Sequence, residues 1–195
     1  MQLNAIKKYV ESDAGKKIKL IWFDYSCMPQ GDDRTVAERA EFQLMLNSIT
    51  NLYASASVLI LLDTQYLGRF WPLTESWCSM QQADPDVGLR NARGGEERYT
   101  IECIHSATAA HVQALIATVK DKSNEDIARD LSKPDILVTN QKDKDAIVPI
   151  VRDMAEKIRH HFRGEADDEG ASKGGKVESA PAPAGAEDTV GRVEA

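Results

Sequence analysis

Long hydrophobic runs are missing from this chain of 195 residues, although 42% of its residues are hydrophobic. No run approaches the roughly 20 apolar residues that cross a bilayer. The N-terminal stretch MQLNAIKKYV also lacks the apolar core of a secretory signal. These absences give no sign of a membrane partner and predict a soluble, cytoplasmic protein.

Cysteine is scarce as well, with three residues and no CxxC spacing. An odd number of unclustered cysteines indicates neither a disulfide framework nor a zinc site. We therefore expect reduced thiols, no metal site and no required cofactor.

A strong basic charge is the third absence. The chain has a formal net charge of -7, and the segment 164–195 holds eight acids against three bases. The remaining residues are close to neutral and lack the basic stripe that binding to phosphates needs, so nucleic acid is excluded as a partner. The Gly, Ala, Pro and Ser content of 164–195 predicts a disordered acidic tail behind a single domain at 1–163.

Within 1–163, short apolar runs alternate with helical patterns. Helices are expected in the first ten residues, over 36–54, from Pro72 to about 82, over 107–120 and 125–131, and around a last apolar stripe at 147–158. The short, continuous apolar runs predict parallel strands buried on both faces. These strands are expected near 18–24, 57–62, 98–104 and 135–140. Alternation of this kind predicts an α/β fold with a doubly wound parallel sheet.

Ligands of such sheets bind beyond the carboxyl ends of the strands. The side chains expected at that edge are Asp24, Cys27, Asp63, His105 and Asn140, with Glu75 nearby on the following helix. Cys27 and His105 could in principle form a thiol–imidazole pair. A small buried cysteine without an acyl-transfer motif is the simpler interpretation.

Part of the sequence resembles the fungal heterokaryon-incompatibility (HET) domain. The signature of that family is filled here by Trp22, Asp24, Cys27, Gln30, Glu38, Arg39, Tyr53 and Ala56. The next stretch, VLILLDTQYLGRFWPLTE, is similar to a Toll/interleukin receptor (TIR) domain. Its pattern is matched by Tyr66, Trp71, Leu73 and Glu75, with Pro72 in place of a cysteine. The two families are regarded as related in fold, and the resemblance covers roughly residues 18–80.

The TIR resemblance implies a flavodoxin-like sheet whose first, central strand this chain lacks. We therefore expect either an N-terminally shortened product or another element in the place of that strand. The family's catalytic glutamate corresponds to Glu75, which implies cleavage of the nicotinamide–ribose bond of NAD+. Asp24, Asp63 and Trp71 are then the candidate residues for binding NAD+.

A purely structural role is the alternative for each of these residues. An acid in the first turn of a helix gains about 0.3 to 1 kcal/mol from the macrodipole without catalysis. Asp24 can cap its own loop, and tryptophans beside a helix start more often belong to the core.

Two functions follow from the resemblance. The first is a TIR-like signalling module that assembles with itself or with similar domains. Its interface is expected in the loop after residue 24, at Tyr25, Met28 and Pro29. The alternative is a TIR-type NAD+ glycohydrolase that uses Glu75.

Overall fold

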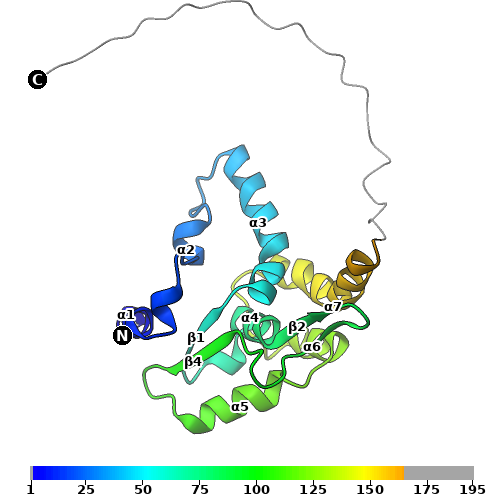
Figure 1. Ribbon diagram of the computed structural model, residues 1–195. Coiled ribbons are helices and arrows are strands. Elements are labelled where there is room, and N and C mark those ends of the chain that lie inside the picture. The colour runs from blue at the N-terminus through cyan, green and yellow to red at the C-terminus, as the bar shows by residue number, and fades with distance from the viewer. Residues whose placement is uncertain (1, 165–195) are drawn as a thin grey trace, which may run out of the picture. The chain divides into compact units, whose positions relative to one another are not determined.

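The computed structural model describes residues 2–164 (Figure 1). The acidic tail predicted over 164–195 lies outside these residues, except for Gly164. The α-helices are α1 Gln2–Glu11, α2 Asp24–Cys27, α3 Val36–Ser55, α4 Phe70–Met80, α5 Ala109–Val119, α6 Asn124–Leu131 and α7 Gln141–Arg163. The strands are β1 Val58–Leu62, β2 Gln81–Asp84, β3 Gly88–Asn91 and β4 Tyr99–Cys103. Two 3-10 turns, η1 Gly15–Lys17 and η2 Tyr66–Gly68, complete the elements of this part of the chain.

Two of the four predicted strands form a small parallel sheet. β1 pairs with β4, with Val58 opposite Tyr99 and Leu62 opposite Cys103. Helix α4 lies between these strands in the sequence and contacts both of them. The α/β character and the parallel pairing are confirmed at this level, as are the predicted helices to within a few residues.

The predicted strand at 18–24 is wrong. Residues 18–23 are extended but have no strand partner within 2–164, and Asp24 already begins α2. We had expected this run to be buried on both faces. Leu20, however, is 90% exposed. Apolar character predicted an extended backbone, but a strand also needs a neighbour to complete its hydrogen bonds.

The predicted strand at 135–140 shrinks to one parallel bridge between Leu137 and Arg69. A turn at residues 133–136 precedes this bridge. The amino group of the buried Lys144 holds the turn by donating to the carbonyl oxygens of Lys133 at 2.7 Å and Ile136 at 3.2 Å. Asn140 then caps α7, which leaves little chain to pair.

An antiparallel hairpin, β2–β3, follows α4 and was not among the predicted strands. Asp84 turns the chain, since its Oδ1 accepts the amide hydrogens of Asp86 at 3.0 Å and Val87 at 3.2 Å. Such an Asx turn is a recognisable signal for a hairpin. The hairpin packs against α7.

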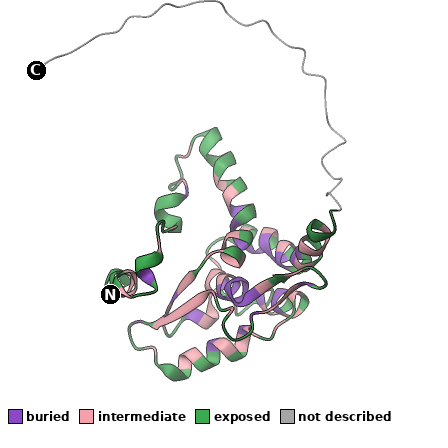
Figure 2. Ribbon diagram, viewed as in Figure 1, coloured by how far each residue is buried: buried purple, intermediate pink, exposed green. Residues whose placement is uncertain are grey.

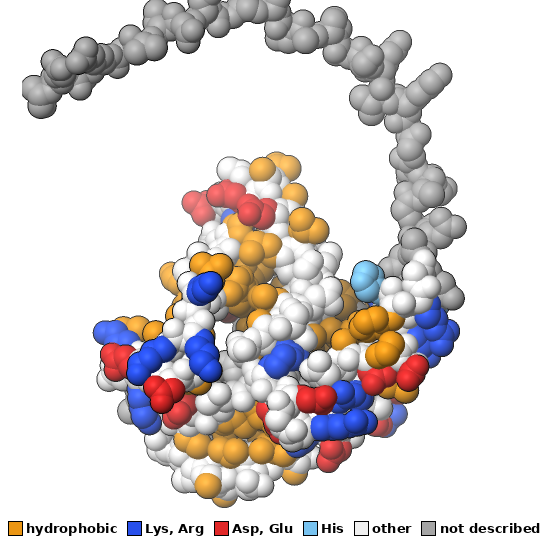
Figure 3. Space-filling model, viewed as in Figure 1, with side chains coloured by type: hydrophobic (Ala, Val, Ile, Leu, Met, Phe, Trp, Pro, Cys, Tyr) orange, Lys and Arg blue, Asp and Glu red, His pale blue; other side chains and the backbone are white. Residues whose placement is uncertain are grey.

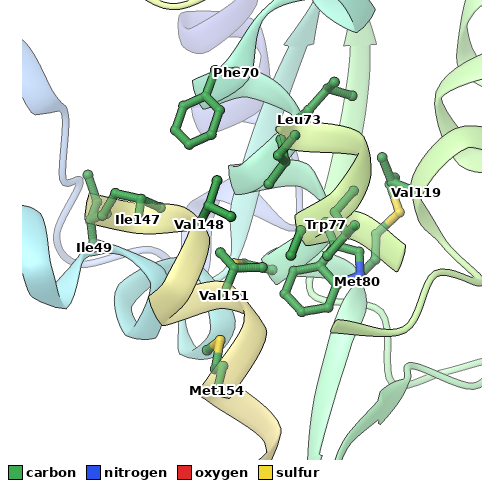
Figure 4. Close-up of a cluster of buried hydrophobic side chains, with 14 of the residues drawn as sticks. Ile49, Phe70, Leu73, Trp77, Met80, Val119, Ile147, Val148, Val151 and Met154 are labelled. Atoms are coloured by element: carbon green, nitrogen blue, oxygen red, sulfur yellow. The ribbon is translucent and has the colours of Figure 1, made fainter. Parts of the chain in front are cut away.

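The core gathers around α4. Phe70, Leu73, Trp77, Cys78 and Met80 are 0–2% exposed. Figure 4 shows side chains of α3, α4, α5 and α7 converging in this cluster. By contrast, Figure 2 shows that the region around α1 and α2 is mostly exposed. No helix within 2–164 is both long and apolar enough to span a membrane.

Gly88 offers a test of the hairpin's packing. Its φ is +83°, and a Cβ atom there would meet the backbone carbonyl of Ala155 in α7. We expect Gly88→Ala to lower the free energy of unfolding by at least about 2 kcal/mol, because positive φ strain alone costs about 1 to 3 kcal/mol. Gly94→Ala is the matched control, since a Cβ there meets no atom within 4 Å. Urea unfolding of the two variants measures the difference, and equal stabilities would contradict this packing.

Candidate functional site

Glu75 lies in the second turn of α4, which begins at Phe70. The first turn of this helix contains no acid, so the interpretation of Glu75 as a first-turn partner of the macrodipole is wrong. The helix was predicted to begin at Pro72 but begins two residues earlier, so Pro72 is the third residue of its first turn. It breaks no helical bond, because the first one runs from the amide of Leu73 to the carbonyl of Arg69 at 3.2 Å.

The carboxyl group of Glu75 meets side chains from three separate segments. The Tyr53 side chain of α3 forms a hydrogen-bonding interaction with it, and the charges of Asp24 and Arg69 act on it. The ring of Tyr53 packs edge-on against Trp22, with 5.9 Å between ring centroids. The structure therefore brings together Trp22, Asp24, Tyr53 and Glu75, all of which belong to the resemblance.

Burial raises the pKa of Glu75 from 4.5 to about 8. The interaction with Tyr53 lowers the pKa, nearby Asp24 raises it and Arg69 lowers it, so loss of hydration dominates. The same burial, with the charge of Glu75 beside it, raises the pKa of the Tyr53 hydroxyl. At neutral pH the Glu75 carboxyl is thus mainly protonated and ready to ionise when a cation arrives.

Asp63 follows β1, as predicted, and is held by Arg69. One guanidinium nitrogen of Arg69 lies 2.9 Å from each carboxylate oxygen of Asp63. The guanidinium also lies 5.8 Å from the centroid of the Tyr66 ring. Sequence reasoning missed Arg69. The signal available was an arginine directly before the helix that carries Glu75.

Arg69 also lines a cavity of about 870 Å³, a size that suits a small-molecule ligand, although Glu75 is not among its lining residues. Its lining includes Thr64, Gln65, Arg69, Trp71, Leu137 and Thr139. Trp71 therefore lines a cavity, one helical turn before Glu75, whereas Trp77 is fully buried in the core.

A smaller cavity, of about 270 Å³, lies between α3 and the start of α7. Arg34, Arg39, Asn140 and Asp143 are among its lining residues. The Arg34 guanidinium stacks 4.2 Å above the Phe42 ring. Trp71 forms a hydrogen-bonding interaction with Asp143, so this tryptophan connects the surroundings of both cavities.

Asp24 takes part in a local backbone hydrogen bond and also acts electrostatically on the residues around Glu75. Its Oδ1 accepts the amide hydrogen of Tyr25 at 2.8 Å, the local cap that aspartate often provides. Its charge also reaches Tyr53 and Glu75. Gln30 fixes the loop by donating to the carbonyl oxygens of Asp24 at 3.2 Å and Met28 at 3.0 Å.

The three predicted interface residues differ in exposure. Tyr25 is 72% exposed, Pro29 is half-buried, and Met28 is 7% exposed within the core cluster. The expectation that Met28 presents apolar surface on this loop is therefore wrong. Its side chain instead anchors the loop to the body of the domain.

The remaining candidates have local roles. The sulfur of Cys27, an exposed residue, accepts the amide hydrogen of Phe23 at 3.5 Å. Asn140 caps α7 by accepting the amide hydrogen of Lys142 at 3.2 Å. His105 follows β4 with a φ of +54°. Its pairing with Cys27 stays a hypothesis.

No family model matches this chain, and no match was found among curated proteins or solved structures.

The raised pKa of Glu75 makes a prediction about stability. Between pH 4.5 and about 8, the folded protein keeps a proton on Glu75 that the unfolded chain has released. The free energy of unfolding is therefore unaffected by Glu75 below pH 4.5. It decreases as the pH rises from 4.5 through about 8, where the folded protein also loses the proton. We expect Glu75→Gln to raise the melting temperature above pH 8 by roughly 5 °C or more, and to change it little at pH 4.5.

Glu38→Gln is the control with the opposite sign. Glu38 closes a capping box with Thr35. Hydrogen bonds from the Thr35 side chain and backbone lower the pKa of Glu38. Its stabilising effect is present above pH 4.5 and is lost as pH falls below it, so Glu38→Gln should lower the melting temperature at pH 7. Calorimetry across pH 4 to 9 compares both variants; a Glu75→Gln profile parallel to wild type would contradict a buried, destabilising carboxyl.

Proposed function

We propose that the chain is a TIR-like signalling module that works by self-assembly and follows a flavodoxin-like, doubly wound plan. One observation carries this proposal: a run of large apolar side chains stands exposed between α1 and α2. Leu20 is 90% exposed, and the run also includes Ile21, Phe23 and Tyr25. Monomeric proteins rarely expose contiguous apolar surface of this kind, and such patches mark contact sites.

This apolar run is held in place rather than hanging loose. Trp22, before α2, packs against Tyr53, and Met28, directly after α2, is buried in the core. Figure 3 shows hydrophobic side chains at the surface around α2. A surface fixed at both ends loses little conformational freedom when a partner covers it, which favours association.

Self-assembly can be tested by sedimentation of the full chain over a range of concentrations. We expect species larger than the monomer, in amounts that increase with concentration. The double variant Phe23→Ser, Tyr25→Ser should weaken association at least about tenfold, because both exposed rings leave the surface. Unchanged far-UV circular dichroism would show that the fold survives. A strict monomer at every concentration would reject the module.

The second candidate function is hydrolysis of NAD+ at Glu75, a half-buried residue whose carboxyl interacts with Tyr53 and feels the charges of Asp24 and Arg69. In this reaction the bond between the ribose and the nicotinamide nitrogen breaks. The bonding electrons leave with nicotinamide, the ribose becomes an oxocarbenium-like cation, and water adds to it and releases a proton. A carboxylate beside the ribose stabilises that cation.

The protonated state of Glu75 fits this chemistry. The nicotinamide ring of NAD+ is positively charged, and a cation beside a buried carboxyl lowers its pKa and ionises it. Trp71 offers a flat face at the larger cavity. Asp24 is the freer acid for a ribose hydroxyl, because Asp63 is engaged by Arg69. NAD+ is a substrate in this proposal, and no cofactor is required.

Release of nicotinamide from NAD+ tests the second candidate. We expect kcat/KM to rise with pH through about 8 as free Glu75 ionises. Glu75→Gln should abolish release because the amide keeps the shape and loses the charge. Glu41→Gln, an exposed glutamate on α3, is the matched control and should keep full activity. No release from the folded, assembled wild type would reject this function.

A further inference from the structure

The free edge of β1 is the first observation. In the parallel ladder, the amide of Val58 donates to the carbonyl of Arg98 at 2.7 Å, and the amide of Ile104 donates to the carbonyl of Leu62 at 2.9 Å. Alternate residues of a parallel strand bond to opposite neighbours. The backbone groups of Leu59 and Leu61 therefore face away from β4, and no strand within 2–164 pairs with them.

The extended segment 18–23 is the second observation. Ile18 has φ -77° and ψ 126°, and Phe23 has φ -140° and ψ 118°, so both ends are extended. Within the described residues, the backbone groups of residues 19–22 form no hydrogen bond. Leu20 and Trp22 would share one face of a strand, and Ile21 and Phe23 the other. Apolar residues on both faces suit a strand inside a sheet, not an exposed connection.

Residues 2–164 thus contain an unpaired extended segment and an unpaired sheet edge at β1 that are not bonded to each other; the outer edge of β4 has no strand partner in this range either. The segment is tied at one end to α1, which contacts β1, and at the other to Tyr53 through Trp22. Its six residues match the five of β1 in length. Unpaired edges of this kind are templates for pairing with another chain.

We propose that residues 18–23 of one copy add as a strand to the free edge of β1 in a second copy. The exchange is reciprocal, so both unpaired segments and both open edges are used in a two-fold dimer. A foreign strand on β1 would leave residues 18–23 exposed, and this favours a second copy as the occupant. The inference rests on the proposed self-assembly and names its contact.

Ile21→Pro is the sharpest test. Proline removes one amide hydrogen and is confined to sheet edges. Within residues 2–164 the Ile21 amide has no hydrogen-bond partner, so the fold should survive. We expect the dimer dissociation constant, measured by sedimentation of the full chain, to rise at least about tenfold.

A matched pair of leucines controls for general loss of apolar surface. Leu20 is 90% exposed in the segment, and Leu44 is 69% exposed on α3. Leu20→Lys should weaken the dimer as Ile21→Pro does, and Leu44→Lys should leave it unchanged. If the two lysine variants weaken association equally, or neither does, the strand exchange is overturned while self-assembly by another surface stands.

Amide hydrogen exchange locates the contact directly. The outward amides of Leu59 and Leu61 should exchange at least about tenfold more slowly at dimer-forming concentrations than in dilute protein. The amides of Ile60 and Leu62, already bonded to β4, serve as internal controls. A dimer without slowing at Leu59 and Leu61 would overturn the exchange. A strict monomer would overturn both this inference and the self-assembly on which it rests.

Discussion

Burial of most of α4 is the constraint on which the rest of the domain depends. The helix contacts α3, α5, α6, β1 and β4, so it positions both strands of the parallel sheet and three of the other helices. Its buried hydroxyls stay satisfied inside the helix, with Thr74 donating to the carbonyl of Phe70 at 2.9 Å and Ser76 to that of Leu73 at 3.0 Å. Trp77 donates to the carbonyl of Lys122 at 3.0 Å, which fixes the connection to α6.

A carboxyl group on such a helix is costly. Each unit by which the pKa of Glu75 rises corresponds to about 1.4 kcal/mol against its charged form. An apolar or amide side chain would suit this position better for stability alone. Strongly perturbed acids among other polar groups are candidates for function; here Tyr53 of α3 interacts with the acid, and the charges of Asp24 in α2 and Arg69 after η2 act on it. Destabilising a fold to keep a poised group is a common compromise at active sites.

The sequence patterns predicted elements whose partners are local or whose apolar face is regular. The helices and the pair β1–β4 belong to this class, because β-branched runs bounded by turns specify a buried strand wherever its neighbour lies. The segments 18–24 and 135–140 have the same apolar pattern and were also predicted as strands. Neither forms one, for reasons that depend on residues distant in the sequence. The first lacks a neighbour, and the second begins beside a turn that Lys144 holds through the carbonyls of Lys133 and Ile136. Arg69 was missed for a similar reason, since its partner Asp63 gains meaning only when η2 folds the two together.

The exposed segment and the buried carboxyl are parts of one continuous stretch of backbone. Residues 18–23 include Trp22, whose ring packs against Tyr53, and lead directly into Asp24, whose charge acts on Tyr53 and Glu75. A strand paired with a second copy would restrain the backbone before Asp24, which in the single chain is held by the Trp22–Tyr53 contact and, beyond Asp24, by Gln30 and Met28. Any change in the distance between these two acids alters the pKa of Glu75, because like charges raise it. Linkage is reciprocal, so a ligand that ionises Glu75 would in turn favour one of the two arrangements of residues 18–23. In these proposals an interface made of backbone hydrogen bonds and a site made of side chains would be joined by the short stretch from Trp22 to Asp24.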